Sequence, residues 1–247
     1  MARRRMARGP GGNVRAIALP VIAIVLVLGS IQAWTRNAEQ SEPKPPTAYG
    51  TAHAAALDLT VKGRAAKTGY ERDEFGSGWV DVDRNGCDTR NDELALRLTA
   101  LVMDGDCVVL SGTLDDPFTG ELIVFERGGA SEVDIDHLVA LSDAWQKGAA
   151  QWEYAQRVAF ANDPLNLEPV SAAENRAKGD SDAATWLPPD RTYRCEYVAR
   201  QVAVKTKYDV WVTQAELDAM LDVLDTCPDE PLPNFGAQPI VADNVGR

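Results

Sequence analysis

Histidine is scarce in this sequence, and so are closely spaced cysteines. The chain has 247 residues with only two histidines and four cysteines. A histidine-rich zinc site needs more imidazoles than this, and a zinc ribbon needs C-x-x-C pairs, which the sequence lacks. The composition therefore excludes the commonest structural zinc sites.

Positive charge is also in short supply. The chain has 25 basic and 37 acidic residues, a formal net charge of −12. This balance argues against a protein that coats nucleic acid through bulk charge, although it leaves room for a local nucleic-acid site. With 45% hydrophobic and 25% charged residues, the chain can bury a core, and wholesale disorder is excluded.

The basic residues that are present gather at the N-terminus. Residues 1–15 contain five arginines and no acid, and an apolar stretch follows over residues 16–31. This order predicts a signal peptide or an uncleaved membrane anchor over residues 1–33, with residues 16–33 as the anchoring segment if it is retained. We expect the remainder, with 20 basic and 37 acidic residues and thus a net charge of −17, to be secreted or held in the cell envelope.

Composition divides the rest of the chain into three parts. Residues 34–51 are rich in Pro, Glu and Lys and predict a flexible linker, residues 52–227 predict the folded domain, and residues 228–247 predict a disordered tail. Export makes disulfides possible, and four cysteines permit three pairings. Proximity in the chain favours the pairs Cys87–Cys107 and Cys195–Cys227, and no histidine lies near a cysteine to suggest a catalytic thiol.

Hydrophobic periodicity predicts an α+β fold in which a small hairpin lies among helices. The expected helices cover residues 54–67, 91–102, 153–160, 171–178, 193–208 and 214–224. The last of these starts with the capping-box spacing of Thr213 and Glu216. Extended segments are expected near Trp79 and over residues 108–110, 121–125, 132–141 and 166–170, with a turn joining the second and third.

The residues that carry chemistry cluster in the middle of the chain. Asp136 and His137 lie on a strand-like run, and Asn175 lies on a helix that follows a second extended run. Asp136 and Asn175 offer oxygen ligands that suit Mg²⁺ or Mn²⁺, and His137 can take a proton from an attacking water. Lys178, three residues after Asn175, could hold a phosphate. This set predicts metal-assisted phosphodiester hydrolysis.

At these residues the sequence resembles the HNH, or ββα-metal, nuclease superfamily. The resemblance is carried by DIDHLVAL at residues 134–141 and by NLEPVSAAENRAKGD at residues 166–180. Within the superfamily the chain looks most like the GmrSD C-terminal-domain branch and its exported actinobacterial relatives. Further signatures of that branch are YERDEFGSGWVDVDRNGCDTRND, NDPLNLEPV and WLPPDRTYRCEYVARQVAVKTKY. The resemblance spans about residues 70–224.

The resemblance implies a role for each position. It implies a ββα-metal core embedded among helices, with His137 as general base and with Asp136 and Asn175 as metal ligands. Asn166 would complete the catalytic set: its side chain would tie the loop of the ββα motif and so hold the strand that carries His137. Asp134 would orient a ligand or a metal-bound water. Asparagine at position 175 replaces the superfamily's usual histidine, which favours Mg²⁺ or Mn²⁺ over zinc. The implied substrate is nucleic acid, with DNA expected and RNA left open.

Weaker patterns suggest further contacts. Arg176 and Arg194 are candidate substrate-binding side chains, although a solvated helix face is an equal reading of the basic run from Arg194 onward. Asp81, Asp83 and Asn85 match the start of a calcium loop, for which a structural aspartate turn is the favoured reading.

Two other functions remain as alternatives to a nuclease. The acidic remainder of the chain suggests a nuclease-fold protein that has become a non-catalytic binding module of the cell envelope. A serine hydrolase is remote, because the sequence has no G-x-S-x-G segment.

Overall fold

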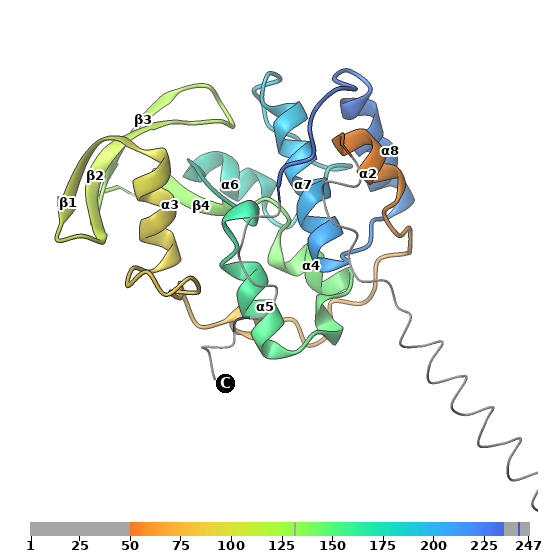
Figure 1. Ribbon diagram of the computed structural model, residues 1–247, viewed down its shortest axis with the longest axis horizontal. Helices are drawn as coiled ribbons and strands as arrows, with labels where there is room; N and C mark the ends of the chain where they lie inside the picture. Colours follow the sequence, from red (N-terminus) through yellow and green to blue (C-terminus); the bar gives the residue numbers. More distant parts are fainter. Residues whose placement is uncertain (1–49, 131, 235–241, 243–247) are drawn as a thin grey trace, which may run out of the picture. The chain divides into compact units, whose positions relative to one another are not determined.

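The computed structural model describes residues 50–130, 132–234 and 242, so the expected signal or anchor segment and nearly all of the linker lie outside the described residues. The described chain combines helices with short antiparallel strands that form two small sheets (Figure 1). This confirms the predicted α+β class. In the part of the chain that the structure describes, no helix is long and apolar enough to cross a membrane.

Two strands and one helix form the centre of the fold. β4 (Val133–His137) pairs antiparallel with β5 (Leu167–Ser171), in a register that sets His137 opposite Leu167. α6 (Ala172–Lys178) starts directly after β5 and ends at Gly179, whose φ of 56° ends the helix. The expected extended segments and helix of the ββα arrangement are therefore present. Between the strands, the chain forms α4 (Leu141–Gln146) and α5 (Tyr154–Ala161), with short 3₁₀ turns.

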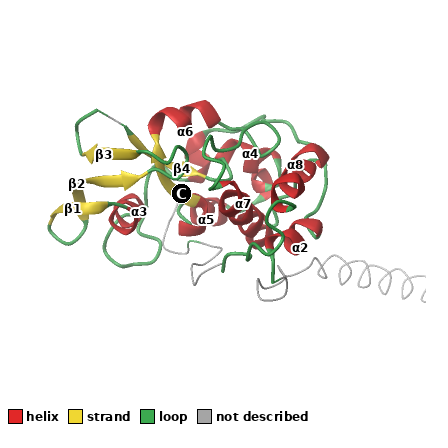
Figure 2. Ribbon diagram, turned by 90° about the horizontal axis from the view of Figure 1, so that it is seen from above, coloured by secondary structure: helices red, strands yellow, loops and turns green. Residues whose placement is uncertain are grey.

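A separate three-stranded sheet precedes this centre in the chain. β1 (Thr99–Asp104), β2 (Val108–Asp115) and β3 (Leu122–Glu126) pair antiparallel in that order. The β2–β3 hairpin was predicted, and α3 (Thr89–Arg97) packs beside β2 (Figure 2). A buried cluster joins this sheet to the centre, because side chains of α3, β2 and β3 pack with side chains of β4 and β5: Leu94, Leu98, Val109, Leu114, Phe125, Val133, Ile135 and Leu167.

Three predicted elements are wrong. The predicted helix over residues 54–67 is only α2 (Ala52–Leu57), after which the chain is irregular and Val61 forms an isolated bridge with Val212. The helix expected through Val102 ends at Arg97, because Leu98 is already extended and the next residues form β1. Its N-cap is Asp88, whose side chain accepts from the Asn91 amide. No strand lies at Trp79 in the described chain.

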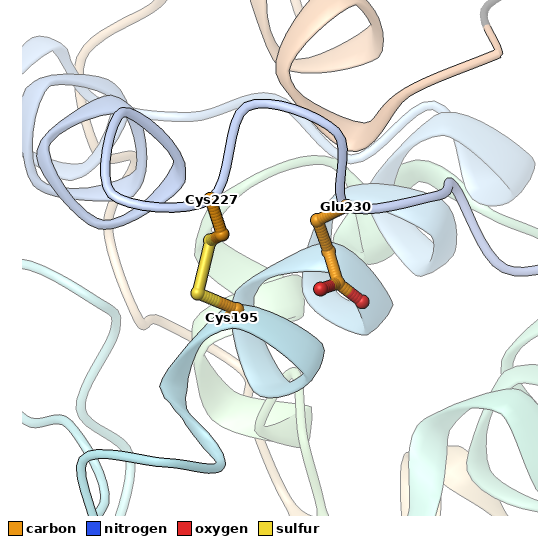
Figure 3. Close-up of side chains that lie close together, drawn as sticks. All are labelled: Cys195, Cys227 and Glu230. Carbon is orange, nitrogen blue, oxygen red and sulfur yellow. A yellow bond between two sulfur atoms is a disulfide. The ribbon is translucent and has the colours of Figure 1, made fainter.

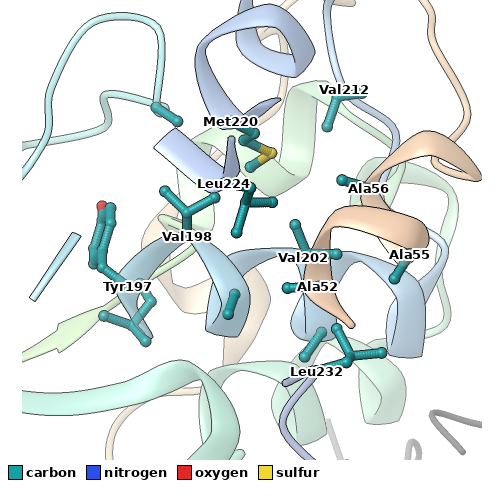
Figure 4. Packing of buried hydrophobic residues seen from close by; sticks show 14 of the residues in the cluster. Ala52, Ala55, Ala56, Tyr197, Val198, Val202, Val212, Met220, Leu224 and Leu232 are labelled. Carbon is teal, nitrogen blue, oxygen red and sulfur yellow. The ribbon is translucent and has the colours of Figure 1, made fainter. Parts of the chain in front are cut away.

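The main core lies among three helices that come from the two ends of the domain. α7 (Arg194–Tyr208) and α8 (Gln214–Leu224) were predicted, and the capping box of Thr213 and Glu216 is confirmed. α2 packs against both helices (Figure 4). The largest fully buried side chain of this core is Tyr197.

Part of the expected disordered tail is packed onto this core. Thr51 forms an antiparallel bridge with Pro231, and Leu232 is buried in the same cluster as α2. The short side chains at the start of α2 leave room for this segment, and the backbone of Ala52 donates a hydrogen bond to Glu230. Residues 228–234 therefore belong to the fold.

Both disulfides expected from chain proximity are confirmed. Cys87 is bonded to Cys107, and Cys195 is bonded to Cys227. Glu230 lies close to the second disulfide, as Figure 3 shows. This trio is the only group of three potential Cys, His or carboxylate ligands among the described residues, but its sulfurs bond to each other and are not thiolate ligands.

Candidate active site

Two neighbouring cavities meet at the C-terminal end of β4. The larger, of about 350 Å³, is bordered by Asp136, His137 and Asn175. The smaller, of about 150 Å³, is bordered by the glycine-rich segment 76–78. Both cavities share Arg72, His137 and Leu141: the histidine thus lies where they join.

His137 is held as a neutral imidazole. Its Nε2 lies 2.9 Å from the carbonyl oxygen of Ala161, and because a carbonyl only accepts, Nε2 carries the proton and Nδ1 is the free acceptor. Trp79 stacks on the ring with a centroid distance of 5.8 Å. Burial, with the positive charges of Arg72 and Lys178, lowers the pKa of His137 to about 3. The ring therefore stays uncharged at neutral pH, as a base must be before it accepts a proton.

Asp136 is a buried carboxylate with one oxygen unused. Its Oδ1 accepts a hydrogen bond of 3.0 Å from the ammonium of Lys178, whereas Oδ2 is buried with no hydrogen-bond partner among the described residues. Burial raises the pKa of Asp136, and the neighbouring Lys178 opposes that shift. A buried oxygen without a partner is costly unless a ligand completes it, and Asp136 borders the larger cavity.

Asn175 is hydrogen-bonded to Asp134, the residue that the resemblance implied to orient a ligand or a metal-bound water. The amide nitrogen of Asn175 donates to Oδ2 of Asp134 over 3.2 Å. With the nitrogen engaged in this way, the amide oxygen is the atom of Asn175 that remains for a ligand in the larger cavity. β4 supplies the aspartate and α6 supplies the asparagine, so the ββα arrangement itself fixes the pair.

Asn166 holds the loop that follows His137. Its side-chain oxygen accepts from the Val139 backbone amide at 2.8 Å, and its side-chain nitrogen donates to the Val139 carbonyl at 3.3 Å. Its own carbonyl oxygen accepts from the amide of Leu138 at 2.8 Å. Asn166 is fully buried and thus has the geometry of the loop-holding asparagine that the resemblance implied.

Lys178 does not lie where a phosphate contact would need it. The side chain is buried, and its ammonium donates to Asp136 and to the backbone carbonyl of His137 at 2.9 Å. The structure therefore places Lys178 behind Asp136, as a side chain that contacts a candidate ligand, and does not place it for the predicted phosphate contact. Lys178 is the last residue of α6, and its ammonium forms an ion pair with the buried carboxylate of Asp136 on β4.

The two candidate arginines lie away from both cavities. Arg176 is exposed on α6 and borders neither cavity. Arg194 is at the start of α7, where its Nε donates to the carbonyl of Pro188 over 2.8 Å. The structure thus does not bring either side chain to His137.

The aspartate turn at residues 81–86 is satisfied by its own backbone. Both carboxylate oxygens of Asp81 accept from the backbone amides of Asn85 and Gly86, at 3.0 and 2.9 Å. The side chains of Asp83 and Asp92 contact the Asn85 amide group. This supports the structural reading of the segment, which the Cys87–Cys107 disulfide closes.

Several residues at the cavities were not singled out from the sequence. Arg72 borders both cavities, and Trp79 contacts His137. Lys67 and Asp180 pair with each other over 2.9 Å at the larger cavity, and Ser142 donates to Asp180 over the same distance. Arg72 and Trp79 lie within the first family signature, which was the available signal, but nothing in the local pattern placed that segment beside β4.

The residues at the larger cavity fit a divalent metal. The donor set is the unused Oδ2 of Asp136 and the amide oxygen of Asn175, both hard oxygen ligands of the kind that Mg²⁺ and Mn²⁺ prefer. Two protein ligands leave several positions for water and phosphate oxygens, which is how Mg²⁺ is commonly held. His137 borders the same cavity and has a nitrogen available for proton transfer.

Comparison with known proteins supports this reading of the fold. Residues 88–223 match the family described as the C-terminal domain of GmrSD restriction endonucleases. An uncharacterized secreted protein from Arthroderma benhamiae is 38% identical over 189 residues, which cover 75% of this chain and 90% of the relative. No solved structure matches the chain. The family match over more than half of the chain shows that the chain belongs to the family of GmrSD C-terminal domains.

Proposed function

We propose that the protein is an exported, metal-dependent endonuclease that hydrolyses phosphodiester bonds of DNA. The observation that carries the proposal is the engagement of Nε2 of His137 by the Ala161 carbonyl, in a cavity that also holds Asp136 and Asn175. It leaves Nδ1 as the one basic nitrogen of the ring, beside two oxygen ligands.

Each side chain at the larger cavity has a separate role in the proposed hydrolysis. Nδ1 of His137 takes the proton of the attacking water, while the Ala161 carbonyl and the Trp79 ring hold the imidazole in place. Asp136 and Asn175 would hold Mg²⁺ or Mn²⁺. When bound, such an ion stabilises the negative charge on the phosphate and on the departing oxygen. The ammonium of Lys178 donates to Asp136 and opposes the loss of its charge on burial, and Asp134 accepts a hydrogen bond from the amide of Asn175.

Export is the second part of the proposal. Two disulfides in the described chain favour an oxidising compartment, since intracellular thiols are kept reduced. The arginine-rich, then apolar N-terminus supports the same location, with residues 16–33 as signal or membrane anchor. A relative that carries the word secreted in its name agrees with this placement.

The test is plasmid cleavage by the purified exported chain. We expect nicking with Mg²⁺ or Mn²⁺, no nicking with a chelator, and a loss of about 10³-fold or more in His137→Ala. The chain has one other histidine, His53, which pairs with Asp225 over 3.1 Å, so His53→Ala is the matched control and should keep full activity. Cleavage that persists with chelator, or in His137→Ala, would overturn the mechanism. Binding of DNA without cleavage under any divalent metal would instead identify a non-catalytic module. The same assay with RNA shows whether the protein cleaves DNA, RNA or both.

A further inference from the structure

Arg72 is the free cation of the candidate active site. Two basic side chains border the cavities, and Lys67 is already paired with Asp180 and lies 5.2 Å from the centroid of the Tyr70 ring. The side chain of Arg72, in the 3₁₀ turn Arg72–Phe75, is exposed and makes no hydrogen bond or ion pair with another residue that the structure describes. Its charge is nevertheless close enough to contribute to the lowered pKa of His137. A guanidinium in this position has all its donors available for a ligand.

The backbone beside Arg72 also offers unused donors. The amide of Gly76 donates to the carbonyl of Asp73, but the amides of Ser77 and Gly78 donate to no residue in the described ranges. A Cβ atom on Gly78 would meet nothing within 4 Å, so the backbone there is open to an approaching group. Successive free amides in a glycine-rich segment form an anion-binding concavity. The segment borders the small cavity, and Arg72 connects that cavity with the larger one.

We propose that Arg72, together with the backbone amides of Ser77 and Gly78, forms a phosphate-binding subsite that holds the substrate strand at the phosphate next to the one cleaved at His137. This inference rests on the proposed nuclease function and identifies groups that bind the substrate beside the site of cleavage. A guanidinium fits two phosphate oxygens at once, and the small cavity places the neighbouring nucleotide on the Trp79 side of His137.

The charge balance explains why such a contact matters here. Asp73 borders the same small cavity, and the described chain is strongly acidic, so long-range attraction of a polyanion is weak. Affinity must then come from direct contacts at short range. Arg72 supplies one such contact without competing with the buried ion pairs.

The experiment measures binding separately from cleavage. A fluorescein-labelled 20-nucleotide DNA, single-stranded and as a duplex, is titrated with His137→Ala protein in Mg²⁺ at several salt concentrations. In that background we expect Arg72→Gln to weaken binding about tenfold and to reduce the slope of log Kd against log salt by about one, the signature of one lost phosphate contact. Arg72→Lys should restore the slope and part of the affinity.

The matched control is Arg191→Gln, an exposed arginine that borders neither cavity and should change neither affinity nor slope. Unchanged affinity and slope in Arg72→Gln would overturn the subsite, and so would an absence of DNA binding in the parent protein. If the parent binds DNA through Arg72 but the wild type does not cleave it, the hydrolytic function fails while the subsite stands. In an active wild type, Arg72→Gln should raise KM more than it lowers kcat.

Discussion

At the scale of single residues, Glu93 is the side chain whose charge state the fold changes most plainly. It lies on α3 with Oε2 buried and without a hydrogen-bond partner in the described chain. Burial raises its pKa from 4.5 to about 8, with nearby Arg97 opposing and Glu168 adding to the shift. Folding therefore favours the protonated carboxyl group.

This shift makes stability depend on pH through one residue. A carboxyl group whose folded pKa is raised contributes its stability fully below the unfolded pKa and loses it as pH rises through the folded value. Wild type should thus lose stability between pH 4.5 and 8. Glu93→Gln stays neutral throughout and is expected to remove this loss, a difference on the order of 5 kcal/mol at pH 9. Urea unfolding at pH 5 and pH 9 measures it; identical pH dependence in both proteins would contradict the assignment.

The residues of the candidate active site could be predicted to lie together where they are on regular structure and close in the chain. Asp134, Asp136 and His137 share one strand, and Asn175 follows the paired strand by a few residues, so strand pairing and a short connection bring them together. Arg72 lies more than 60 residues earlier, in a segment with little regular structure. Its position depends on tertiary packing, which no local period reveals.

At the scale of elements, the junction of α3 and β1 shows where periodicity misleads. The apolar residues from Leu94 to Val102 keep a helical spacing, yet the helix ends at Arg97 and Ala100 takes a φ of 51°. The reason is a contact distant in sequence: Gly112 on β2 lies so close to Leu98 that an added Cβ would be 2.8 Å from Leu98 Cδ2 and 3.1 Å from the carbonyl of Thr99. Pairing with β2 therefore replaces the helix that the local pattern favours.

Gly112→Ala should accordingly be destabilising. The new methyl group meets side chain and backbone at distances that force one of them to move, which costs about 1–3 kcal/mol. Gly63→Ala is the matched control, because a Cβ there meets nothing within 4 Å and its φ is outside the left-handed region; it should change stability by less than about 0.5 kcal/mol. The urea concentration at half-unfolding is measured for both variants and for wild type. Equal midpoints in the two variants would show that β2 accommodates the added methyl group without cost.

At the scale of the whole domain, a buried network of charges connects segments far apart in the sequence. The Lys147 ammonium contacts Asp143, Asp182 and Glu216 at 2.6 to 2.8 Å. Lys205 on α7 adds a contact of 2.9 Å to Glu216, and Arg64 contacts both aspartates from the segment after α2. Three cations and three carboxylates thus balance inside the domain, with α4, α7 and α8 all contributing.

Removing one cation should unbalance this network. In Lys147→Met the three carboxylates lose their shared, fully buried partner, and we expect a loss of about 3–5 kcal/mol. Lys62→Met is the control at an exposed lysine, which lies over the Trp211 ring at 5.0 Å and should cost no more than about 1 kcal/mol. Thermal unfolding with the disulfides intact distinguishes the two. A loss in Lys147→Met as small as in the control would mean that the network contributes little to stability.

The bridge between Thr51 and Pro231 joins the start of the described chain to the segment that follows α8. Cys227 lies four residues before Pro231 and is bonded to Cys195 in the first turn of α7. The segment after α8 is therefore held to the domain in two ways, by a covalent bond to α7 and by a backbone contact with the start of α2. If the backbone bridge opens, the disulfide still keeps this segment beside the core, so the opening is local and reversible.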